Sequence, residues 1–159
     1  MNREKRRAVF IAIGAPAGSA LVGTMLAGDG PKTWYPTLRK SRLILPLTAF
    51  VPVALLYYLM CGALLYRLLA VVRPSRSRTQ AFRLLATMMA ANEGWNYLLF
   101  RRRSTRASLV GMIGFALITV VLYRVLRRLD PPTARMLLPY LIWLGYDLVW
   151  AYELWRLNR

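Results

Sequence analysis

The sequence contains no histidine and a single cysteine, Cys61. Without histidine, the chain offers no imidazole as a haem ligand, a zinc ligand or a general base. One cysteine can form neither a disulfide within the chain nor a cysteine-based metal cluster. No nucleophile with a partner base and no carboxylate pair at a catalytic spacing is evident. These absences argue against an enzyme, and we expect no required cofactor.

Acidic residues are also scarce: 6 Asp and Glu stand against 23 Lys and Arg, for a net charge of +17. Such a balance alone suggests a nucleic-acid partner. However, the basic residues lie in short connectors between apolar blocks, where their side chains can reach anionic lipid head groups. We therefore expect a lipid bilayer as the partner and no nucleic acid.

Long apolar runs dominate what is present, since 57% of the residues are hydrophobic. Residues 8–28, 43–66 and 107–123 contain no charge, and residues 84–100 and 136–155 are interrupted only by acids. A helix of about 20 residues crosses a hydrocarbon core about 30 Å thick. The five blocks are each near that length, so little chain is left for a soluble domain.

The pattern predicts an all-α integral membrane bundle of five transmembrane helices in a single domain over residues 1–159. We expect the helices at about 7–27, 46–72, 79–100, 106–128 and 133–156, because backbone polar groups in lipid must be paired within helices. Only the connector 28–45 is long, so the later helices pack antiparallel. The N-terminus is similar to a signal peptide, but its apolar stretch is long for one. A retained first helix favours a bacterial cell membrane.

Polar and aromatic residues form stripes on three of the predicted helices, at spacings that place them on one helix face. The stripes comprise Asn92, Trp95 and Asn96 on the third helix, Tyr140, Trp143, Asp147 and Trp150 on the fifth, and Tyr57, Tyr58 and Cys61 on the second. Together these stripes could line one cavity inside the bundle.

Each of these residues also has a purely structural interpretation. Asn92 and Asn96 could hydrogen-bond between helices without touching a ligand, and Tyr152 and Trp155 suit the membrane interface. An ionisable residue in a membrane span is a functional-site hypothesis by default. For Asp147, a structural ion pair or a neutral, protonated acid stands equally with ligand contact.

Several short motifs follow one another in a recognisable order. They are Trp34-Tyr35 with Leu38, Lys40 and Pro46, then Pro52-Val53 with Tyr58 and Gly62, then Asn92-x-x-Trp95 with Phe100, then Pro139-Tyr140-Leu141-x-Trp143, and last Trp155-Arg156-x-Asn158. In this order and at this spacing the chain resembles the TspO/MBR family over nearly its whole length.

The resemblance implies a five-helix membrane bundle, commonly a homodimer, whose cavity is closed by a lid loop at 28–45. It implies binding of porphyrins or haem, of sterols, or of synthetic ligands such as benzodiazepines. Carried over by position, Tyr35 belongs to the lid, while Asn92, Trp95 and Trp143 line the pocket; with Tyr58 and Asp147 of the stripes they form the candidate ligand site. Val149, Tyr152 and Arg156 fit the family's sterol-recognition pattern, a weak motif on physical grounds.

The chain departs from the family pattern at several pocket and lid positions. Lys40-Ser41 stands where the family usually has Lys-Pro, and Leu43 and Ala54 replace aromatic residues. Asp147 stands where a small residue usually adjoins the ligand. An ionised Asp147 would repel the carboxylates of a porphyrin unless it faced a basic group. These departures indicate an altered ligand preference.

We therefore expect a sensor or carrier for tetrapyrroles or similar flat apolar molecules. Two alternatives stay open. One is a small transporter in which Glu93 and Asp147 relay protons or cations. The other is light-dependent porphyrin degradation through Trp95 and Trp143, which the resemblance suggests.

Overall fold

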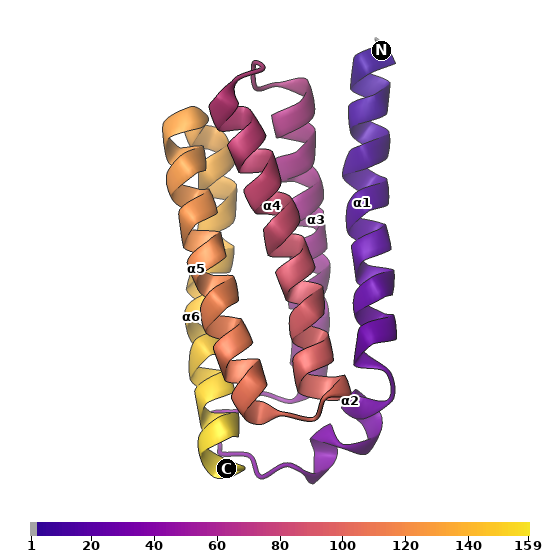
Figure 1. Cartoon of the computed structure of the whole chain (residues 1–159), viewed down its shortest axis with the longest axis vertical. Coiled ribbons are helices and arrows are strands. Elements are labelled where there is room, and N and C mark those ends of the chain that lie inside the picture. Colours follow the sequence, from indigo (N-terminus) through magenta and orange to yellow (C-terminus); the bar gives the residue numbers. More distant parts are fainter. Residues whose placement is uncertain (1–2) are drawn as a thin grey trace.

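The computed structural model describes residues 3–159, and the secondary structure of this part of the chain consists of helices and turns, with no strand. The long helices in it are α1 (Arg3–Ala27), α3 (Phe50–Ala70), α4 (Arg76–Asn96), α5 (Thr105–Leu129) and α6 (Pro131–Leu157). They stand side by side in one bundle, with the N-terminus and the C-terminus at opposite ends (Figure 1). The expected all-α class is confirmed.

Short elements complete the described chain at one end of the bundle. They are α2 (Gly30–Thr33), the 3-10 turns η1 (Tyr35–Thr37) and η2 (Leu47–Ala49), and η3 (Tyr97–Arg101), a π-helical turn that continues α4. The segment from α2 to α3 crosses the end of the bundle that holds the C-terminus (Figure 1). This is the connector expected at 28–45.

Local sequence signals explain where the helices begin. The Ser75 hydroxyl accepts a hydrogen bond from the Arg78 amide at 3.1 Å, and the Ser104 hydroxyl accepts one from the Ala107 amide at 3.2 Å. Each caps the first turn of a helix. Pro131, which has no amide hydrogen to leave unpaired, opens α6. The charged residues at the ends of the apolar blocks lie within the helices, so α1 and α4 begin a few residues earlier than expected.

Each long helix packs against two or three others. α1 lies against α3 and α4, while α5 lies between α4 and α6, and α3 also contacts α6. Leucines on four of these helices are fully buried between them, among them Leu64, Leu85, Leu122 and Leu137. Gly62 lets α3 approach α1 closely, since a Cβ there would stand 2.6 Å from the Ala12 carbonyl oxygen.

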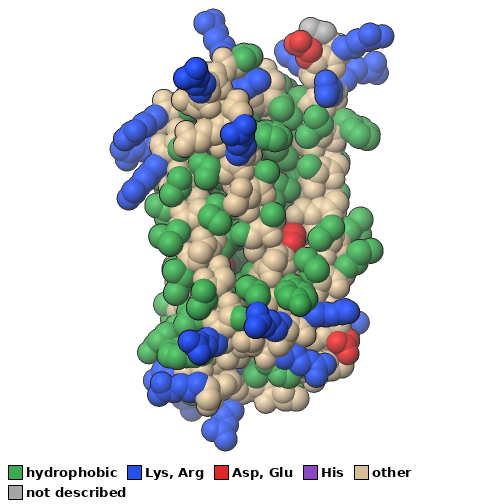
Figure 2. Space-filling view, in the orientation of Figure 1, with side chains coloured by type: hydrophobic (Ala, Val, Ile, Leu, Met, Phe, Trp, Pro, Cys, Tyr) green, Lys and Arg blue, Asp and Glu red, His purple; other side chains and the backbone are tan. Residues whose placement is uncertain are grey.

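Large apolar side chains cover the outside of the bundle. Phe10 is 81% exposed and Ile142 is 79% exposed. Lys and Arg gather at the two ends, with a hydrophobic band between them (Figure 2). Within the described residues, α1, Leu47–Ala70 and α5 are long and apolar enough to cross a membrane. An apolar exterior between charged ends is the surface that a bilayer requires.

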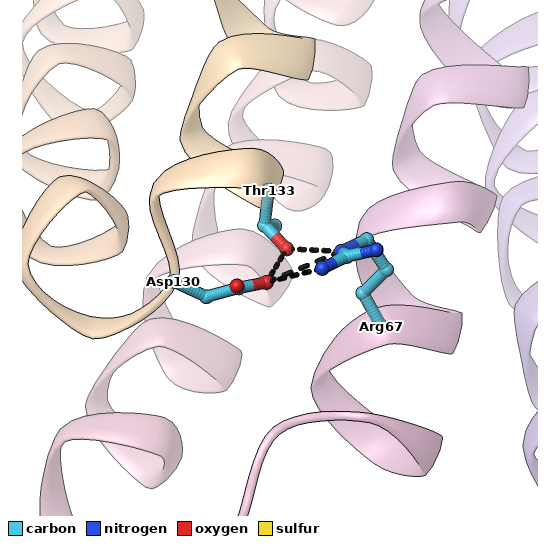
Figure 3. A network of polar contacts seen from close by, with 3 residues as sticks. All are labelled: Arg67, Asp130 and Thr133. Carbon is cyan, nitrogen blue, oxygen red and sulfur yellow. Dashed lines mark hydrogen bonds and ion pairs between the residues drawn. The ribbon is translucent and has the colours of Figure 1, made fainter.

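A polar network fastens α3 to the start of α6 (Figure 3). Arg67 Nη2 and Nε donate to Asp130 Oδ2 at 2.9 and 3.2 Å, and Arg67 Nε donates to the Thr133 hydroxyl at 2.6 Å. The Thr133 hydroxyl also donates to Asp130. Burial alone would raise the pKa of the Asp130 carboxyl, but the hydrogen bonds from Thr133 and Arg67 and the charge of Arg67 lower it below its ordinary value.

Stability should therefore depend on the ionisation of Asp130. Its lowered pKa stabilises the folded state above the ordinary aspartate value of about 3.9, and this contribution is lost as the pH falls below that value. We expect Asp130→Asn to lower the thermal midpoint in detergent at pH 7, at a cost of about 1–2 kcal/mol. The difference from the unsubstituted protein should shrink towards pH 3.

The control is Asp29→Asn, since Asp29 pairs with Arg103 only at 3.9 Å and both side chains are exposed. An exposed pair contributes little to stability. Equal midpoints for Asp130→Asn and Asp29→Asn at pH 7 would contradict the role assigned to the network.

The close approach of α1 and α3 gives a second prediction. Gly62→Ala places a methyl group against the Ala12 backbone, which cannot move without displacing α1. We expect a loss of about 1–3 kcal/mol, seen as a lower thermal midpoint in detergent. Gly114→Ala is the matched control, because a Cβ at Gly114 meets no atom within 4 Å. An unchanged midpoint in Gly62→Ala would show that the helices are not held this closely.

Candidate functional site

A cavity of about 520 Å³ lies inside the bundle. It extends from the end of α1 and from α2 to side chains of α3, α4, α5 and α6. Its aromatic lining consists of Phe50, Tyr57, Tyr58, Trp95, Phe100, Phe115, Tyr140, Trp143 and Trp150. Its polar and charged lining consists of Thr24, Lys32, Asn92, Asn96 and Asp147. The cavity is thus a mainly aromatic chamber with a few polar groups, as small-molecule sites commonly are.

Trp150 is the centre of the aromatic wall. Its ring centroid lies 5.2 Å from that of Phe50, 5.6 Å from that of Trp95 and 6.2 Å from that of Tyr35. Its side chain is almost wholly buried. Since aromatic pairs at these separations attract one another beyond their burial, the wall is a packed unit contributed by α3, α4, α6 and the lid.

The structure brings most of the predicted site residues together. Tyr58, Asn92, Trp95, Trp143 and Asp147 all line the cavity. That they bind a ligand stays a prediction.

Tyr35 is placed differently, since it lies behind Trp150 and is not among the lining residues. Burial raises the pKa of its hydroxyl above the ordinary value, so Tyr35 is neutral at physiological pH. The residues of the sterol pattern lie outside the chamber as well. Val149 and Tyr152 are exposed on α6, and Arg156 donates to Glu153 at 3.0 Å.

Phe50 is a lining residue that sequence reasoning did not single out. Its ring lies 5.6 Å from that of Trp143, and it supplies aromatic surface one helical turn before Ala54, where the family usually has an aromatic residue. Phe50, Ala54 and Tyr57 are spaced four and three residues apart, so they share one helix face and all three line the cavity. That spacing was the signal available in the sequence.

Asp147 is the one acid among the described residues that line the cavity. It is 7% exposed, and its Oδ1 atom has no hydrogen-bond partner among the described residues. No Lys or Arg of residues 3–159 forms an ion pair with it. The alternative of a structural ion pair, which the sequence left open, is therefore not what this fold provides.

Glu93 is equally buried but fully partnered. Its Oε1 accepts from the Ser19 hydroxyl at 2.7 Å, the Tyr58 hydroxyl at 3.0 Å and Asn92 Nδ2 at 3.2 Å. Its Oε2 accepts from Asn96 Nδ2 at 3.3 Å. The network joins α1, α3 and α4 beside the cavity. Asn92 and Asn96 donate to Glu93 of their own helix, so the hydrogen bonds between helices come from Ser19 and Tyr58.

The lid is held to α6 by hydrogen bonds at two points. Asn158 Oδ1 accepts from the Arg39 amide at 2.8 Å, and Asn158 Nδ2 donates to the Arg39 carbonyl at 3.0 Å. The Tyr146 hydroxyl donates to the Leu43 carbonyl and accepts from the Leu45 amide, both at 3.0 Å. These bonds fix the connector across the end of the bundle.

Lys40 shapes the lid from within. Its Nζ donates to the carbonyl oxygens of Tyr35, Pro36 and Leu38 at 2.8, 3.3 and 3.1 Å. It also lies 4.7 Å from the centre of the Tyr35 ring, within range of a cation–π contact. The lysine thus closes the η1 turn although Ser41, not proline, follows it.

Comparison with known proteins agrees with this geometry. A model described as the TspO/MBR family matches residues 11–156, nearly the whole chain. The chain belongs to the TspO/MBR family. It is similar to a protein of the sheep, Ovis aries, named translocator protein, with 27% identity over 149 residues. The match covers 91% of this chain and 86% of the sheep protein.

Membership of the TspO/MBR family shows that this protein lies in a membrane. The family consists of integral membrane proteins that bind ligands, and three helices of this member are long and apolar enough to cross a membrane. The chain is therefore an integral membrane protein, and its exposed apolar side chains face lipid.

The clamp at Asn158 should control how often the lid opens. Asn158→Ala removes two hydrogen bonds to Arg39, and such bonds contribute about 0.5–1.5 kcal/mol each. We expect tryptic cleavage at Arg39, Lys40 and Arg42 to become about tenfold faster in detergent, because local opening limits cleavage. Tyr152→Phe, on the same helix and away from the lid, should leave the rate unchanged. An unchanged rate in Asn158→Ala would mean that the clamp does not hold the lid.

Proposed function

We propose that this TspO/MBR protein binds flat, largely apolar ligands, such as tetrapyrroles or sterol-like molecules, in the cavity of the bundle and serves as a sensor or carrier for them. The aromatic chamber of about 520 Å³ is the observation that carries the proposal. Its volume lies within the range of small-molecule sites, about 300–1,000 Å³. Its walls offer ring faces on which a planar molecule can stack.

Unpartnered polar atoms in the wall support the proposal. The Trp95 and Trp150 Nε1 atoms and the Tyr57 hydroxyl are buried and have no hydrogen-bond partner among the described residues. Buried donors without partners are costly, and a bound polar group would relieve that cost. The chamber therefore suits a molecule that is mainly apolar but carries a few polar atoms.

The membrane topology is part of the same proposal. α4 and α6 are less apolar than the three clear spans, yet their acids Glu93 and Asp147 are buried within the bundle. Helices that hide their polar side chains among neighbours can cross a bilayer. We infer five transmembrane helices on this basis, and we carry over the homodimer as an implication of the family.

The transporter alternative has less support from the geometry. A relay through Glu93 and Asp147 needs both carboxylates on one aqueous path. Glu93 does not line the cavity, and its oxygens are occupied by neutral donors from three helices. Of the two acids, Asp147 is the one that lines the cavity. This placement fits contact with a ligand better than a relay between two carboxylates.

Binding can be tested with protoporphyrin and the purified protein in lipid nanodiscs. We expect saturable quenching of tryptophan fluorescence, and Trp143→Ala should weaken the affinity about tenfold because it removes a ring from the chamber wall. Trp155→Ala is the matched control, since Trp155 packs on Tyr152 outside the cavity. Empty nanodiscs measure partition of the porphyrin into lipid. Equal affinity in the two variants would refute the proposed site, and absence of saturable quenching would exclude porphyrins as its ligands.

A further inference from the structure

We propose that the ligand of this cavity carries a positively charged nitrogen group, and that the Asp147 carboxylate is its counter-ion. The inference rests on the proposed function and names the chemical class of the molecule bound. The expected ligand is a flat, apolar molecule with one cationic group, such as a protonated amine or a positively charged aromatic ring nitrogen.

Asp147 is a buried acid whose hydrogen bonding is incomplete. The side chain is more than nine-tenths buried, lines the cavity and has an oxygen without a partner among the described residues. Burying a carboxylate without a partner is among the most costly arrangements in a protein. A cationic group in the cavity would supply the missing charge and the missing hydrogen-bond donor together.

The other two buried carboxylates, those of Glu93 and Glu153, have hydrogen-bond or ion-pair partners within the protein. Glu93 accepts four hydrogen bonds from neutral donors. Glu153, also 7% exposed, pairs with Arg156 at 3.0 Å on the same helix as Asp147. Of the three, Asp147 is the one that lines the cavity and has an oxygen without a partner among the described residues, so we expect the partner of that oxygen to come from the cavity.

The aromatic surroundings suit the same chemistry. Trp143 and Trp150 stand four residues before and three residues after Asp147, so both indoles share its helix face and line the cavity. Indole faces attract cations, and tryptophan does so best among the aromatic side chains. A carboxylate between two tryptophans thus offers a cation both a counter-ion and ring faces.

The remaining charge in the lining favours one orientation. Lys32, on α2, is exposed and lies at the lid end of the cavity, whereas Asp147 is buried in α6. A ligand with its cationic group directed inward avoids Lys32 and meets Asp147. A molecule that directed carboxylates inward would instead place them against the Asp147 oxygens.

Two probes of nearly identical shape can test the inference: N-methylacridinium, a flat cation, and 9-methylanthracene, its neutral isostere. Each is titrated against the full chain in nanodiscs, with empty nanodiscs as the partition blank. We expect the unsubstituted protein to prefer the cation, and Asp147→Asn to reduce that preference about tenfold or more, as close charge pairs do when one member is removed. Glu153→Gln is the matched control, because it removes a buried carboxylate of α6 that lies outside the cavity. It should leave the preference unchanged.

The outcomes separate the inference from the proposed function. If the neutral probe binds saturably but the cation is not preferred, or if Asp147→Asn keeps the preference, the cationic class is overturned while the binding function stands. Loss of preference in Glu153→Gln to the same extent would also overturn it, since the effect would then be general charge. If neither probe and no porphyrin binds, the proposed function falls and the inference with it.

Discussion

The lack of hydrogen-bonding partners in hydrocarbon is the constraint on which the rest of this structure depends. A polar group that faces lipid has nothing to bond, so every one must be paired inside the protein or kept at the ends of the bundle. The fold meets the second condition, and it meets the first except at buried atoms of the cavity wall, such as Asp147 Oδ1 and Trp95 Nε1, which have no partner among the described residues. Phe10 and Ile142 face outward, while Lys and Arg gather at the two ends (Figure 2). The acids Glu93 of α4 and Asp147 of α6 are buried inside the bundle.

Tight helix contacts follow from the same constraint. Ser19 on α1 and Tyr58 on α3 reach Glu93 on α4 only because these helices approach closely. A Cβ at Gly23 would overlap the Glu93 carboxylate, so glycine leaves the space in which the acid is satisfied. Gly62 permits the approach of α1 to α3 in the same way. Small residues on α1 and α3 and the buried acid on α4 are thus parts of one arrangement.

The sequence carried the features that depend on local pattern. Apolar blocks near 20 residues and their charged ends placed the helices to within a few residues. Three- and four-residue spacing put Asn92 and Trp95 on one helix face and Trp143 on the aromatic face of another helix, and all three residues line the cavity. Pattern could not show that Tyr35 packs behind Trp150 or that Asn158 clamps Arg39, because these pairs are more than a hundred residues apart. Such contacts depend on how the lid crosses the bundle, which no local spacing encodes.

Glu93 and Asp147, two acids that interrupt apolar blocks of the sequence, have different surroundings in the structure. Both interrupt apolar blocks, and both could have been structural or functional. Hydroxyl and amide donors from three helices form hydrogen bonds to the Glu93 carboxylate, so this acid has its partners without a ligand. The fold leaves Asp147 with an unpartnered oxygen in an aromatic wall. Since the same chain shows that it can complete a buried carboxylate, the incomplete one is best understood as part of the binding surface. We therefore expect the departure from the family pattern at position 147 to change which molecules the cavity prefers.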